Sequence, residues 1–208
     1  MSQENIINKP NNPFESVQIP EFRNLITGRF LFILSLRMMS TLTGWWIYKL
    51  TSAPFAIGLI GLSEVVPALT LALYAGHYID MSEKKKLLLT GVFAYGCACC
   101  ILWFLSSDFT KSHLTNRWIA ICIYAVIFCT GIVRAFAGPT FNVILSLIVP
   151  RHSLQNATTW NQGAWLTASV TGHALGGFCI ALVGIHGTLA FICGGIFVAF
   201  IVLTGLKR

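Results

Sequence analysis

Long apolar runs, separated by short polar breaks, make up most of this chain. The runs cover residues 24–50, 54–78, 86–107, 118–148, 157–183 and 187–206. A helix needs roughly 20 residues to cross a bilayer, so runs of this length with few charges are typical of transmembrane helices. The pattern therefore predicts an all-α membrane protein whose six helices form one domain over residues 23–208.

The segment before the first apolar run is different in character. Residues 1–22 are polar and contain Pro10, Pro13 and Pro20. They include no basic region followed by a cleavage site, which a secretory signal peptide would have. A polar, proline-containing segment of this kind buries too little apolar surface to fold alone. We expect residues 1–22 to be a disordered cytoplasmic leader.

Composition supports the membrane assignment. The chain is 55% hydrophobic and only 10% charged, whereas a soluble domain carries about 25% charged residues. The net charge of +7 could indicate nucleic-acid binding. However, the basic residues are scattered at the ends of the apolar runs and form no basic face, which argues against a nucleic-acid partner.

The same basic residues predict the orientation of the chain in the membrane. Lys84, Lys85 and Lys86 lie together in a short polar break, and positive loops stay on the cytoplasmic side. Six spans then place both termini in the cytoplasm, and the expected location is the cell (inner) membrane. Trp45 and Tyr48, near the far end of the first run, fit an interfacial aromatic belt.

Three charged residues lie near the middle of predicted spans. They are Arg37, Glu64 and Arg134. A charge at the bilayer centre costs about 2.5 kcal/mol or more, so it normally faces a partner or a watery cavity. Glu64 could simply pair with one arginine to hold helices together, but the other arginine would remain. We therefore expect a substrate or proton path, and the excess of arginine favours an anionic substrate.

His173, in the fifth run, is a further candidate for this path. Histidine is the residue type most suited to carrying protons, although a lone histidine in a membrane helix is more often a packing residue. The same run carries small residues spaced four apart, which let another helix approach closely. They are Ala164, Ala168, Gly172 and Gly176.

Other site chemistry has weak support in the sequence. All seven cysteines lie inside apolar runs, where they are typical of small buried hydrophobes rather than of disulfides or metal ligands. Neither a Gly-x-Ser-x-Gly elbow nor a phosphate-binding glycine loop with lysine is present. We therefore predict no enzyme activity and no cofactor.

The polar break around the three lysines resembles a family motif. Gly76 is followed four residues later by Asp80 and then by Lys84 and Lys85. This spacing is similar to the loop between helices two and three of the major facilitator superfamily, although Met81 stands where that family usually has Arg. The resemblance implies a gating loop that helps to hold the inner ends of two transporter halves together.

Two later motifs resemble the same family. Arg134 with Gly138 looks like the fourth-helix motif, in which an arginine handles substrate or protons. Gly172-His173 with Gly176-Gly177 looks like the fifth-helix motif of exporters, with histidine in place of proline. The run from Leu147 to Arg151 is similar to the branch that includes siderophore and macrolide exporters.

The resemblance implies a fold and a function. Such transporters have two six-helix halves, each made of two inverted three-helix repeats, around a site at the bilayer midplane. This chain resembles the N-terminal half. We expect an antiporter-type, proton-coupled efflux of small organic molecules by alternating access. Its partners would be the small-molecule substrate, the lipid bilayer and a second six-helix half in the same gene product or another chain. The alternative is a six-helix membrane scaffold or partner subunit that does not transport.

Overall fold

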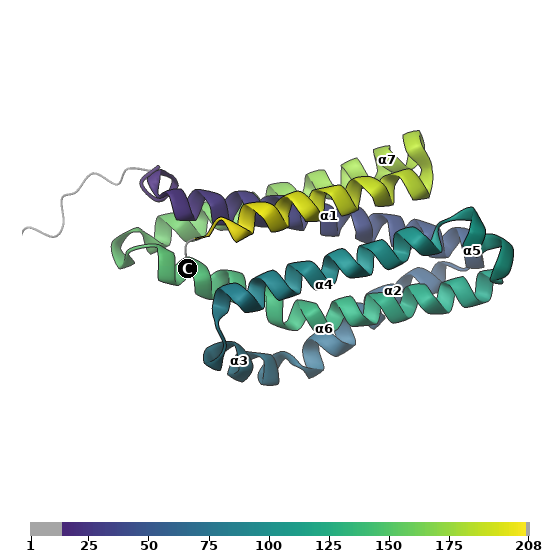
Figure 1. Cartoon of the computed structure of the whole chain (residues 1–208), viewed down its shortest axis with the longest axis horizontal. Coiled ribbons are helices and arrows are strands. Elements are labelled where there is room, and N and C mark those ends of the chain that lie inside the picture. The colour runs from purple at the N-terminus through teal and green to yellow at the C-terminus, as the bar shows by residue number, and fades with distance from the viewer. Residues whose placement is uncertain (1–13, 207–208) are drawn as a thin grey trace, which may run out of the picture.

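The computed structural model describes residues 14–206, and every regular element in that range is helical (Figure 1). The long helices lie side by side in an elongated bundle. In chain order the helices are α1 (Pro20–Thr51), α2 (Pro54–Thr70), α3 (Ala72–Met81), α4 (Lys84–Leu105), α5 (Asp108–His113), α6 (Asn116–Ile148) and α7 (Leu154–Thr204). Short 3-10 turns lie at Ser16–Gln18 and Arg151–Ser153.

Several of these helices have the length and apolarity of membrane spans. Helices α1, α4 and α6 qualify, as does the segment Arg151–Thr204, and the bent pair α2–α3 is a further candidate. Large apolar side chains also lie exposed on the outside of the bundle, such as Leu73 at 91% and Leu182 at 82%. Apolar surface of this extent suits contact with lipid. The prediction of an all-α, multi-pass membrane protein is confirmed.

Helix α7 contains two predicted spans, joined by a tight reversal. Gly184 has φ +69° and ψ −173°, which interrupts the helix. Only glycine adopts such a conformation without strain, because it has no Cβ. The arms 154–183 and 185–204 run back along one another (Figure 1). The reversal falls where the sequence predicts the turn between the fifth and sixth spans. The grouping of the helices into two inverted repeats stays a prediction.

The predicted span 54–78 is broken. Helices α2 and α3 meet at an angle of 53°, and Leu71 between them has φ −91° and ψ −6°. Pro67 lies one turn before this break and has no N–H to donate within the helix, which weakens the backbone there. Gly76 and Asp80 therefore lie inside helix α3, and the expected polar loop shortens to Ser82 and Glu83 between α3 and α4.

Two polar segments are more structured than the sequence predicts. The segment expected to be a loop after the third run contains helix α5, whose N-cap Ser107 accepts a hydrogen bond from the Thr110 amide. The predicted leader also ends early. Its residues 1–13 lie outside the described residues, but Ser16 is buried and its hydroxyl donates to the Ser153 carbonyl oxygen at 3.2 Å. Helix α1 then begins at Pro20, a favourable first helical residue.

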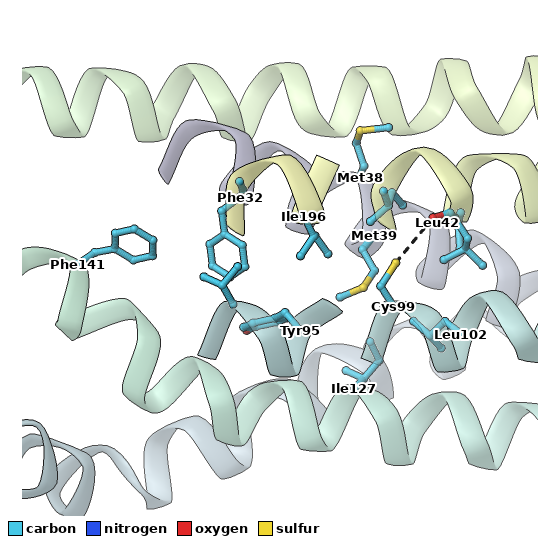
Figure 2. Close-up of a cluster of buried hydrophobic side chains, with 14 of the residues drawn as sticks. Phe32, Met38, Met39, Leu42, Tyr95, Cys99, Leu102, Ile127, Phe141 and Ile196 are labelled. Carbon is cyan, nitrogen blue, oxygen red and sulfur yellow. Dashed lines mark hydrogen bonds between the residues drawn. The ribbon is translucent and has the colours of Figure 1, made fainter. Parts of the chain in front are cut away.

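The core lies between α1, α4, α6 and α7. Figure 2 shows buried side chains from all four helices, among them Phe32, Tyr95, Phe141 and Ile196. Cys99 is fully buried in this cluster, as expected for a small apolar side chain, and its Sγ lies 2.9 Å from that of Cys193. This contact joins α4 to the second arm of α7.

Glycines allow α7 to pack closely against α1. A Cβ atom added at Gly172 would lie 2.7 Å from the Cβ of Arg37, and one at Gly176 would lie 3.1 Å from the Cα of Met38. These distances leave no room for a side chain. The predicted close approach along the small residues of the fifth run is therefore present at these two positions.

Candidate functional site

The centre of the candidate site is an ion pair between helices α2 and α6. The Arg134 Nη1 donates to the Glu64 Oε1 at 2.5 Å. The two side chains are partly solvated, with 46% of Arg134 and 26% of Glu64 exposed. Glu64 and Arg134 each lie near the middle of their predicted spans, so the pair satisfies two charges that would otherwise be costly in a membrane.

Close packing of the backbones positions this pair. Gly131 lies on α6 three residues before Arg134, and its Cα faces the Glu64 carbonyl oxygen and Pro67 of α2. A Cβ at Gly131 would lie 2.7 Å from the Pro67 Cγ. The absence of a side chain at Gly131 thus lets α2 come close enough to α6 for the carboxylate and guanidinium to meet.

Arg37, on α1, completes the predicted trio. It lines the same cavity as Glu64 and Arg134, a space of about 170 Å³. Its guanidinium carbon lies 5.7 Å from the ring centre of Trp165, on α7. Such a cation–π contact stabilises a guanidinium without neutralising its charge. The structure therefore brings together the three midspan charges, and leaves Arg37 without the carboxylate.

Sequence reasoning missed a third arginine in this cavity. Arg29 donates from Nη1 to the Asn142 Oδ1 at 2.9 Å, and its guanidinium carbon lies 5.2 Å from the Phe141 ring centre. Its Nε is buried and has no hydrogen-bond partner within the described residues. The available signal was spacing: Arg29, Ile33 and Arg37 recur every four residues, so they share one face of α1.

Aromatic residues form much of the remaining wall. Tyr95 is buried, and its hydroxyl donates to the Thr130 carbonyl oxygen at 3.1 Å. Its ring meets that of Phe32 edge to face at 5.2 Å, and Phe32 in turn lies 6.0 Å from Phe141. Figure 2 shows these three rings pointing toward one another from α4, α1 and α6. The cavity thus combines fixed aromatic walls with an excess of positive charge.

Residues 25–208 match the family model of the Major Facilitator Superfamily. The match covers most of the chain, including every residue of the cavity. The chain belongs to the major facilitator superfamily. No curated protein matched the chain. Members of this superfamily are transporters rather than enzymes, so a membrane-embedded enzyme is not supported.

His173, which we expected on the same path as the midspan charges of this major facilitator protein, lies apart from them. Its Nδ1 lies 2.8 Å from the Thr41 Oγ1, which ties α7 to α1. His173 lines a different hollow of about 490 Å³, with Thr41, Trp45 and Tyr48. It does not line the cavity of Glu64, although Ser40 borders both spaces. The structure thus separates His173 from the charge cluster.

The residues of the expected gating loop lie at the ends of α3 and α4. The Lys84 ammonium donates to the Asp80 carbonyl oxygen at 2.6 Å, and the Lys85 ammonium donates to the Leu206 carbonyl oxygen. Asp80 and Gly76 are exposed, and a Cβ at Gly76 would meet no atom within 4 Å. Lys84 and Lys85 therefore contact backbone oxygens in the described residues rather than the Asp80 carboxylate.

The packing glycines divide into two groups. Gly172 and Gly176 touch α1, as described above. Gly138 and Gly177 have no heavy atom within 4 Å of an added Cβ, and Gly138 borders the charged cavity.

Among residues 14–206, no group of three or more His, Cys, Asp or Glu side chains could hold a metal ion.

Proposed function

We propose that this chain is the N-terminal part of a secondary transporter that exports small organic molecules in exchange for protons. The observation that carries the proposal is the Glu64–Arg134 ion pair at 2.5 Å, in a cavity that also contains Arg37. Charges near the middle of apolar helices are costly unless they face a partner or water; Glu64 and Arg134 have each other, and Arg37, which has no such partner among the described residues, favours a polar path. The segment from Gly172 through Gly177 resembles the fifth-helix motif of exporters, and this favours efflux as the direction of transport.

In this proposal Glu64 is the proton carrier. As a carboxylate it holds Arg134. When it takes up a proton, the ion pair loses its charge attraction, and Arg134 becomes available to a substrate or to water. Substrate and proton would thus compete for one charged cluster, which is the arrangement that an exchange mechanism needs.

Alternating access supplies the movement. We propose that a second six-helix half faces this one, and that the two rock against each other around the midplane cavity. Gly76, Asp80, Lys84 and Lys85 would form the gating loop on the cytoplasmic side, where Lys84 already contacts the end of α3. Both termini would be cytoplasmic, in the cell inner membrane, in line with the positions of the lysines.

A second candidate is a scaffold or partner subunit that does not transport. One observation favours it: the Glu64–Arg134 pair joins α2 to α6 and could serve packing alone. The two functions predict different effects of neutralising Glu64. In a scaffold the loss would be structural, whereas in a transporter it would remove the response to a proton gradient.

The test is proton-driven accumulation in inverted membrane vesicles that contain the protein as its gene encodes it. Fluorescein serves as an anionic probe and ethidium as a cationic one. We expect accumulation of at least one probe that a protonophore abolishes and that Glu64→Gln removes. Vesicles with the Glu15→Gln variant should behave as the unmodified protein does, because Glu15 lies before α1 and belongs neither to the cavity nor to the proposed gating loop. Equal signals from protein-containing and empty vesicles would rule out the transporter proposal and favour the scaffold.

A further inference from the structure

We propose that the cavity bounded by Arg37, Glu64 and Arg134 binds a small aromatic carboxylate, with one ring and one negative group. The inference rests on the proposed function in taking this cavity as the substrate site, and it adds the chemical class of the substrate. Its support comes from the charge balance, the size and the walls of the cavity.

The charge balance requires an anion. The cavity is lined by three guanidinium groups and one carboxylate within the described part of the chain. Glu64 is already engaged by Arg134. Arg29 and Arg37 form no ion pair with any described residue, and the Arg29 Nε is buried without an acceptor. Arg29 and Arg37 are both half-buried, and partly desolvated positive charge without a counter-charge is costly, so a ligand carboxylate would stabilise this site.

Arg37 is the better of the two docking groups. Arg29 already donates to Asn142 and lies over Phe141. Arg37 makes no side-chain hydrogen bond to a described residue, and its guanidinium lies over the Trp165 ring. A free guanidinium presents a planar fork that binds a carboxylate through two parallel hydrogen bonds. Arg29 lies about 12 Å away along α1, too far to bind the same carboxylate, so it contributes only its positive charge to the electrostatic potential of the cavity.

The size of the cavity fits one aromatic ring. Its volume is about 170 Å³, and a cavity of about 150 Å³ in another protein is known to hold benzene. The wall contains Phe32, Tyr95 and Phe141, and Trp165 lies beside Arg37. Rings pack favourably in offset or edge-to-face geometry against such walls. An anion with a flat ring therefore satisfies both features of the cavity, whereas an inorganic anion would satisfy only the charge.

The test measures binding rather than transport. The purified full-length protein, in lipid nanodiscs, is titrated with benzoate in a calorimeter. Benzamide has the same shape without the charge, cyclohexanecarboxylate has the charge without the aromatic ring, and inorganic phosphate has charge alone. We expect benzoate to bind at least about tenfold more tightly than each of these, because a charge-assisted pair and ring packing are each worth about one such factor.

Matched variants assign the site. Arg37→Gln should weaken benzoate binding about tenfold or more, and Arg37→Lys should recover part of it, since lysine keeps the charge but not the fork. Trp165→Leu should reduce the preference for benzoate over cyclohexanecarboxylate. Arg23→Gln is the control, because Arg23 lies exposed near the start of the same helix and does not line the cavity. Circular dichroism of every variant checks that the helices remain folded.

Three results would overturn the inference: no benzoate binding by the folded protein, equal binding of benzoate and benzamide, or equal losses in Arg37→Gln and Arg23→Gln. The outcome is separable from that of the proposed function. Arginine-dependent benzoate binding without proton-driven flux would support this site and contradict the transporter. Dye transport without benzoate binding would support the transporter and contradict this substrate class.

Discussion

Gly131 of helix α6 lies directly against the backbone carbonyl of Glu64 in helix α2, one turn before the arginine that binds the Glu64 side chain. The backbone contact and the ion pair are thus formed by the same short stretches of the two helices. The close packing at Gly131 brings the Glu64 and Arg134 side chains together, and their ion pair then stabilises the register of α2 against α6.

Replacement of Gly131 by valine should destabilise the protein. The new side chain would collide with the Glu64 carbonyl and with Pro67, neither of which moves freely within a helix. Overpacking of this kind costs about 1–3 kcal/mol. Thermal unfolding in detergent measures it, and Gly138→Ala is the control, because a Cβ there meets nothing within 4 Å. Equal melting temperatures for the two variants would contradict the close approach of α2 to α6.

Neutralising Glu64 or Arg134 alone should lower the free energy of unfolding more than neutralising both. Glu64→Gln leaves Arg134 charged and unpaired, and Arg134→Gln leaves the carboxylate alone. Because both side chains are partly exposed, we expect about 1 kcal/mol for each single variant. The double variant should recover part of this loss. Unfolding by denaturant gives the four values, and simple additivity of the two losses would show that the pair is not coupled in energy.

Tyr95→Phe should reduce stability by about 1 kcal/mol. The change removes the hydroxyl that donates to the Thr130 carbonyl oxygen and keeps the ring that packs against Phe32. The Thr130 site is buried, so water does not readily replace the lost donor. Thermal unfolding is the measurement. Tyr48→Phe, at an exposed tyrosine of α1, should leave the melting temperature unchanged; a drop as large as that of Tyr95→Phe would contradict the role of the buried hydrogen bond.

Cys99 and Cys193 should cross-link on oxidation. Their sulfur atoms are 2.9 Å apart, so a small uncharged oxidant such as diamide can take up the two protons and two electrons that disulfide formation releases. Peptide mass spectrometry should find the Cys99–Cys193 link. Cys99→Ser should abolish it, and Cys129→Ser, at an exposed cysteine of α6, should not. Recovery of both thiols in the reduced form after treatment would contradict the packing of α4 against the second arm of α7.

The sequence predicted the long helices because membrane spans depend on local length and apolarity. It also predicted that Arg37, Glu64 and Arg134, each near the middle of a span, face a partner or a cavity, since the cost of charge in a bilayer is known without the fold; the path that would join them to His173 stays a prediction. What it missed depends on contacts between distant segments. Arg29 lies nearer the start of α1, and only its neighbours Asn142 and Phe141 show that it belongs to the cavity.

Local breaks were harder to predict for a different reason. Residues 54–78 were predicted as one unbroken span; Pro67 was a possible sign of a weak point that the prediction did not use, and nothing in the sequence fixes the 53° bend beyond it. Helix α5 is short and polar, and a single N-cap serine is a weak signal among many. The separation of His173 from Glu64 depends on how α7 is rotated against α1, which the residue pattern of one helix does not specify.

The reversal at Gly184 also affects how a protease would cut this molecule. The two arms of α7 meet through a single residue, so an endoprotease at that end of the bundle finds no extended segment to bind in its active-site groove. The connection between α4 and α6 lies at the same end (Figure 1) and includes non-helical residues on both sides of α5. Limited digestion should therefore nick the protein around α5 first, and the paired arms of α7 should be recovered as one fragment.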